Sequence, residues 1–103
     1  MPTESYEFNG QMFEWDRNKN LSNIEKHGIT FKMASLVFFD PNAATYDDGQ
    51  HSQEEDRFII IGFGENHKIM TVCHCYREDE TVIRIISARK ATKVEEKLYG
   101  GAF

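Results

Sequence analysis

The stretch "VIRIISAR", residues 82–89, decides the fold of this chain. Its aliphatic side chains would point alternately to both faces of a strand, and a strand that is apolar on both faces is typical of the centre of a sheet. The same stretch also carries two arginines, Arg84 and Arg89. A guanidinium in such a strand is costly unless another group pairs with it, so the sequence raises the question of what that group is.

Two interpretations of Arg84 are open. It could form a structural ion pair with Glu14, Asp16 or another acid, or it could belong to an anion site, because a planar guanidinium matches two phosphate oxygens. Arg89 would lie near the N-terminus of a final helix, whose free N–H groups also favour an anion, although a solvated arginine at a strand end is equally open. Arg84 and Arg89 have opposite parity, so they could act together only if the strand end bends.

The segments on both sides of this strand predict an α+β domain. Residues 12–16 form a short aromatic run that we interpret as an extended entry segment. Asp16 and Gly28 are typical start and stop residues for a helix over 17–27, and Thr30 begins a second helix that ends at Asp40-Pro41. Alternating apolar residues predict strands over 43–47, 57–64, 67–77 and 81–89, and a C-terminal helix follows in the tail "ATKVEEKLYGG". We therefore expect two N-terminal helices, an antiparallel meander of three to four strands and a C-terminal helix.

Length and composition limit the classes of function. A chain of 103 residues is expected to form one domain, here residues 1–103. It has neither a long apolar run nor the basic-then-apolar order of a signal peptide, which favours a cytoplasmic protein without a membrane span. Cys73 and Cys75 would share one face of a strand, so we expect reduced thiols rather than a mutual disulfide.

The net charge of −5 is local rather than general. Residues 47–56 hold five of the 17 acidic residues and no Lys or Arg, so the rest of the chain balances 12 acids against 12 bases. A polyanionic partner would therefore need a focused cationic site rather than a broad basic surface.

Three further residues could carry chemistry. His74 is the only histidine inside a predicted strand, and it could act as a general acid or base or could be a satisfied buried histidine. Lys26 and His27 end the first predicted helix, where they could either complement the helix dipole or serve a site, and helical spacing places them on one side with Lys19 and Asn23. The spacing of the cysteines does not fit a zinc site, and no cofactor-binding motif is present, so we expect neither a metal nor a cofactor.

Three segments resemble the BrnT family of type II toxin–antitoxin ribonuclease toxins. They are "FEWDRNKNLSNIEKHGITFKMASLVFFDP" (13–41), "RFIIIGF" (57–63) and "VIRIISARKATKVEEKLY" (82–99). The characteristic pieces are Trp15-Asp16, Lys19, Asn23, Lys26-His27-Gly28, Phe31, Asp40-Pro41, Arg57-Phe58, Gly62 and residues 83–89. The resemblance covers nearly all of residues 12–99.

This resemblance implies a compact RelE-like fold and a toxin that cleaves RNA without a metal, inhibits translation and takes part in a bacterial stress response. It also implies a BrnA-type antitoxin with a ribbon-helix-helix part, which forms a 2:2 heterotetramer with the toxin and contacts operator DNA, so that the complex represses its own promoter. A catalytically weak binding module, or a toxin that cuts only RNA presented by a ribosome, is an alternative. On the ribonuclease hypothesis Arg84 and Arg89 bind the phosphate, Arg77 or Lys26 adds a cation, and His27 and His74 are the candidate base and acid.

Overall fold

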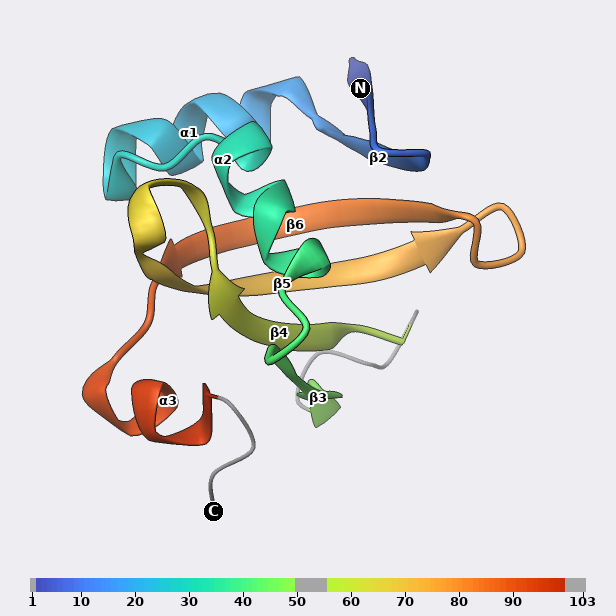
Figure 1. Ribbon diagram of the computed structural model, residues 1–103. Helices are drawn as coiled ribbons and strands as arrows, with labels where there is room; N and C mark the ends of the chain where they lie inside the picture. The colour runs from blue at the N-terminus through green and yellow to red at the C-terminus, as the bar shows by residue number, and fades with distance from the viewer. Residues whose placement is uncertain (1, 50–55, 100–103) are drawn as a thin grey trace.

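The computed structural model describes residues 2–49 and 56–99, and its main feature is one six-stranded sheet with the order β1-β2-β6-β5-β4-β3 (Figure 1). The strands are β1 (Thr3–Phe8), β2 (Gln11–Asp16), β3 (Ala44–Asp47), β4 (Phe58–Phe63), β5 (Ile69–Arg77) and β6 (Val82–Lys90). The helices are α1 (Arg17–His27), α2 (Phe31–Ser35) and α3 (Lys93–Leu98), with short 3₁₀ turns η1 (Leu36–Phe39) and η3 (Glu65–His67).

The predicted helix α1 is confirmed at both ends. The side chain of Asp16 accepts hydrogen bonds from the backbone N–H groups of Asn18 and Lys19, and Gly28 ends the helix in the left-handed conformation. The second predicted helix is shorter than expected. Thr30 caps α2 as predicted, but the chain tightens into the 3₁₀ turn η1 before it reaches Asp40.

The antiparallel meander is confirmed for β3, β4, β5 and β6, and the sheet is larger than predicted. β1 and β2 form a hairpin, and β2 pairs in parallel with β6, so the sheet is mixed. Residues 12–16 are extended and lead into α1, as predicted, but they form a strand of the sheet, which was not predicted. Asn9 and Gly10 make the hairpin turn with φ of 51° and 83°, and this Asn-Gly pair is the sequence signal that could have revealed it.

α1, α2 and η1 pack on one face of the sheet. In Figure 1, α2 and η1 cross in front of β6 and β5, and α1 lies above β6. Between them lies a core of buried aromatic and aliphatic side chains, including Phe13, Trp15, Phe31, Val72 and Ile85. We call this side of the sheet the helix face. α3 lies apart from α1 and α2, beyond the end of β6, and contacts β4 (Figure 1).

Asn23 is the buried residue of α1, and it fixes the helix to the sheet. Its side chain donates a hydrogen bond of 2.9 Å to the carbonyl of Ile29 and accepts one of 3.1 Å from the N–H of Ala88 on β6. Leu21 and Ile24, the apolar residues of this helix, are partly exposed instead. A polar contact, rather than an apolar stripe, therefore sets the position of α1 over β6.

Candidate functional site

Strand β6 contains a β-bulge in the middle of the predicted arginine strand. Cys73 on β5 pairs with Ser87, but the next residue, His74, pairs with Ile85, so Ile86 is an extra residue on β6. A bulge of this kind bends the strand and changes which side chains share a face. It supplies the bend that Arg84 and Arg89 would need if they were to act together.

The bulge places both arginines on the same side of the sheet. Arg84 lies opposite Cys75 and Arg89 lies opposite Thr71, and these two partners share one face of β5 with Cys73. Without the extra residue, the two arginines would point to opposite faces. We call the side that they share the arginine face.

Two neighbouring hollows meet at the bulge. The strand hollow, on the arginine face, has a volume of about 220 Å³ and is lined by Asp48, Arg57, Ile59, Thr71, Cys73, Ile86, Ser87 and Arg89. The helix hollow, beside α1, has a volume of about 190 Å³ and is lined by Lys19, Ser22, Asn23, Lys26, His27, Ile86 and Ser87. Because Ile86 and Ser87 line both hollows, the bulge forms a shared wall between them.

The predicted grouping on α1 is confirmed, because Lys19, Asn23, Lys26 and His27 all line the helix hollow. The two lysines and His27 are exposed to solvent. On the other side of the shared wall, Arg57 and Arg89 line the strand hollow. Together the two hollows, which we call the joined hollows, are lined by four basic side chains, by His27, by one carboxylate, that of Asp48, and by the thiol of Cys73. The excess of positive charge suits an anion.

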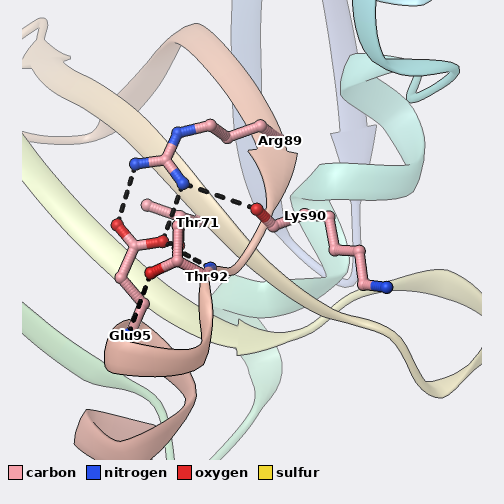
Figure 2. A network of polar contacts seen from close by, with 5 residues as sticks. All are labelled: Thr71, Arg89, Lys90, Thr92 and Glu95. Atoms are coloured by element: carbon pink, nitrogen blue, oxygen red, sulfur yellow. Dashed lines mark hydrogen bonds and ion pairs between the residues drawn. The ribbon is translucent and has the colours of Figure 1, made fainter.

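A network of hydrogen bonds holds Arg89 in place (Figure 2). Its guanidinium donates two bonds, of 2.7 and 2.8 Å, to the carboxylate of Glu95 on α3. The same carboxylate accepts bonds from the hydroxyl of Thr71 and from the N–H of Thr92. About 43% of the Arg89 side chain stays exposed, so the network orients the guanidinium without covering it.

The electrostatics of this pair follow from its contacts. The hydrogen bonds from Arg89 lower the pKa of Glu95 to about 2, against the opposing effect of burial, and those to Glu95 raise the pKa of Arg89. The N-terminus of α3 does not offer the anion site expected beside Arg89, because Glu95 itself caps it together with Thr92. Glu95 was missed as a site residue, although the pattern Thr92-x-x-Glu95 is a capping-box signal in the sequence.

Arg84 has the carboxylate partner that one of its two interpretations requires. Its Nη1 lies 2.6 Å from Oε2 of Glu14, and each of the two side chains is 22% exposed. Glu14 faces Arg84 because β2 runs parallel to β6 and pairs these residues directly. The ion pair with Glu14 therefore compensates for the desolvation of the Arg84 guanidinium in this strand. Arg77 lies half-buried at the other end of β5 from Thr71, opposite Val82.

His74 lines neither of the two hollows, which favours the interpretation as a buried histidine over that as a catalytic acid or base. It is fully buried on the helix face, with its ring 4.7 Å from that of Phe38 and close to those of Phe58 and Tyr76. Burial lowers its pKa to about 4, so the imidazole is neutral at physiological pH. Within residues 2–49 and 56–99, its Nε2 has no hydrogen-bond partner, and Nδ1 lies 3.4 Å from the carbonyl of Val72.

Cys73 and Cys75 are thiols and not disulfide partners. Burial raises the pKa of Cys73 to about 11, and the nearby carboxylate of Asp48 acts in the same direction. The thiol in the strand hollow is therefore protonated at neutral pH and is a poor nucleophile. In the described part of the chain, no three His, Cys, Asp or Glu side chains lie close enough together to hold a metal ion. The helices among these residues are also too short or too polar to cross a membrane.

Comparison with known proteins places this geometry in a family. The family model for the ribonuclease toxin BrnT of type II toxin–antitoxin systems matches residues 15–95. The 1.1 Å crystal structure of the Brucella abortus ribonuclease toxin BrnT is similar, with a TM-score of 0.58 and 30% sequence identity over 77% of this chain and 94% of that chain. No curated protein matches the chain significantly. The segments that carry the joined hollows fall within the matched residues, and the chain belongs to the BrnT family of ribonuclease toxins of type II toxin–antitoxin systems.

Proposed function

We propose that this chain is a metal-independent endoribonuclease that inhibits translation by cutting RNA at the joined hollows. The observation that carries the proposal is the shared wall of Ile86 and Ser87, because it places Arg89 and the cations of α1 in adjoining hollows. Each hollow has the size of a small group rather than of an extended chain, which suits one phosphate of a bound strand.

The chemistry follows from RNA itself. The 2′-OH of the substrate attacks the adjacent phosphorus, so the protein needs a proton acceptor near that oxygen, cations around the phosphate and a proton donor at the departing 5′-oxygen. Arg89 and Lys26 stabilise the charge that builds on the phosphate, and Lys19 adds to the field. His27 is the group on α1 that accepts or donates the proton.

We revise the roles of the other predicted residues accordingly. The ion pair with Glu14 supports a structural role for Arg84 in the middle of the sheet. Arg77, at the far end of β5, is a peripheral cation along the path of the RNA. His74 has no part in the chemistry, because it is buried on the opposite face of the sheet.

We also propose that the toxin acts in the cytoplasm and is neutralised by a BrnA-type ribbon-helix-helix antitoxin in a 2:2 heterotetramer. In that assembly the antitoxin contacts operator DNA and the complex represses its own promoter. Membership of a toxin–antitoxin family supports the antitoxin partner. The mixed sheet flanked by helices supports the expectation of a RelE-like fold.

A second function is favoured by one specific feature of the charges. Arg84 and Arg89 are both paired with carboxylates, and the chain as a whole carries a net charge of −5. Such a chain would be a catalytically weak module whose main task is to bind the antitoxin and tune repression.

Cleavage of a labelled single-stranded RNA by the purified toxin, with and without EDTA, separates the two functions. A metal-independent ribonuclease cuts in both conditions and loses activity in Lys26→Gln and His27→Gln. Lys32→Gln is the matched control, because Lys32 lies over the ring of Tyr6 and away from the hollows. If the wild type leaves both naked RNA and translating messages intact yet binds its antitoxin, the binding module is the correct function.

A further inference from the structure

A third hollow lies at the opposite end of β5 from Arg89. It has a volume of about 290 Å³ and is lined by Asp56, Phe58, Cys75, Tyr76 and Glu80. The rings of Phe58 and Tyr76 lie beside that of His74, so they belong to the helix face, on the other side of the sheet from the strand hollow. The volume is at the lower limit of small-molecule sites, about 300 Å³, and matches a single side chain or one flat ring.

Aromatic rings form the walls of the acidic hollow. The centroids of Phe58 and Tyr76 lie 5.6 Å apart with their planes at 60°, so the two rings make a corner. Tyr76 is 37% exposed, whereas Cys75 at the same hollow is almost fully buried. A corner of two π faces, one of them accessible, attracts a cation.

Carboxylates give this hollow its charge. Asp56 and Glu80 line it, and both are exposed, so they remain available to an incoming group. Glu80 belongs to an acidic turn with Glu78 and Asp79, three consecutive residues with φ between 52° and 68°. Burial, together with the charge of Glu80, raises the pKa of Tyr76. The electrostatic potential in the acidic hollow is therefore negative, whereas that in the joined hollows is positive.

We propose that the acidic hollow receives an arginine or lysine side chain of a protein partner, the antitoxin implied by the family. The inference rests on the proposed function only for the identity of that partner. A guanidinium stacks on the aromatic corner and donates charge-assisted hydrogen bonds to Asp56 and Glu80. An RNA base with an amino group is the competing occupant, and it is disfavoured because its flanking phosphates would meet the acidic turn.

The acidic hollow and Arg89 lie on opposite faces of the sheet. Phe58 pairs with His74, whose ring packs on the helix face, whereas Arg89 pairs with Thr71 on the arginine face. A partner anchored by one basic side chain in the acidic hollow therefore does not need to displace the ion pair between Arg89 and Glu95 in order to bind.

NMR titration of the full chain tests the proposal with two small probes, acetyl-Gly-Arg-Gly-amide and the same peptide with neutral citrulline in place of arginine. The arginine peptide should shift the ring resonances of Phe58 and Tyr76 and bind about tenfold more tightly than the citrulline peptide, with the difference weakening at high salt. Glu80→Gln and Asp56→Asn should each remove most of this preference. Glu78→Gln, in the same turn but outside the hollow, should keep it.

Equal binding of the two peptides, or an unchanged preference in Glu80→Gln and Asp56→Asn, would overturn the proposal. A stronger response of the same resonances to cytidine or adenosine monophosphate than to the arginine peptide would overturn it as well and assign the hollow to a base. RNA cleavage measured on the same variants keeps the two proposals apart. Glu80→Gln should cut RNA as the wild type does, and an inactive wild type would count against the ribonuclease alone.

Discussion

Arg89 and Glu95 form two hydrogen bonds, of 2.7 and 2.8 Å, that join the end of β6 to α3 (Figure 2). The same carboxylate caps α3 by accepting a hydrogen bond from the N–H of Thr92, and it accepts another from the hydroxyl of Thr71 on β5. One side chain thus closes a helix end, ties it to the sheet and orients the cation that faces the strand hollow. These contacts make Glu95 a positioning residue rather than a catalytic one.

Replacing Glu95 by alanine should lower the free energy of unfolding by about 1–2 kcal/mol. Loss of the capping box contributes most of this, because Arg89 is partly exposed and its ion pair is screened by solvent. Urea unfolding followed by circular dichroism measures the change. Glu96→Ala, at an exposed position of the same helix, is the control and should stay within about 0.5 kcal/mol of the wild type. Equal losses in the two variants would mean that the network does not brace α3.

The buried imidazole of His74 should make the protein less stable in mild acid. Its pKa is about 4 in the folded state and about 6.5 when unfolded, so the unfolded chain binds the extra proton as pH falls through this window. The contribution of His74 to the free energy of unfolding is fully present above about pH 6.5. The free energy of unfolding should therefore be about 2 kcal/mol lower at pH 5 than at pH 7. Urea midpoints measured across this range test the expectation.

His74→Leu removes that titration, so its stability should change little between pH 7 and pH 5. His27→Gln is the matched control, because His27 is exposed and its replacement should leave the acid dependence of the wild type in place. A wild type with the same stability at both pH values would contradict the buried, neutral state of His74.

Asn23→Ala should destabilise the fold by about 2–3 kcal/mol, because it leaves the N–H of Ala88 and the carbonyl of Ile29 without their buried partner. The same change should also weaken RNA cleavage, since α1 would no longer be fixed above the bulge. Thermal and urea unfolding measure the first effect. Asn18→Ala, on the exposed side of α1, should be close to neutral, and similar losses for both variants would remove Asn23 from its anchoring role.

The parts of the fold that were predicted correctly depend on local chemistry. Asp16, Gly28 and Thr30 cap helices through bonds to their own neighbours in the chain, and the apolar strands β4, β5 and β6 follow one another with short connections. The hairpin of β1 and β2 was missed even though Asn9-Gly10 signals it. The parallel pairing of β2 with β6 is non-local, and local periodicity carries no information about it.

The candidate site depends on those non-local pairings. Glu14 was one of several possible partners of Arg84 in the sequence, and only the register of β2 against β6 selects it. The bulge at Ile86 depends on how β5 and β6 align, so the shared face of Arg84 and Arg89 could be stated only as a condition. The grouping of Lys19, Lys26 and His27 was predictable, because it needs nothing beyond helical spacing.

The most direct test of the central claim is a comparison of RNA cleavage by Arg89→Gln and Arg84→Gln, with folding of both variants checked by circular dichroism. If the joined hollows bind the scissile phosphate, Arg89→Gln should lower kcat/KM by about 10²–10³-fold while remaining folded. Arg84→Gln, whose arginine serves the ion pair with Glu14, should lose less than about tenfold. A folded Arg89→Gln variant that cuts RNA at the wild-type rate, or an Arg84→Gln variant that loses as much activity as Arg89→Gln, would contradict the account.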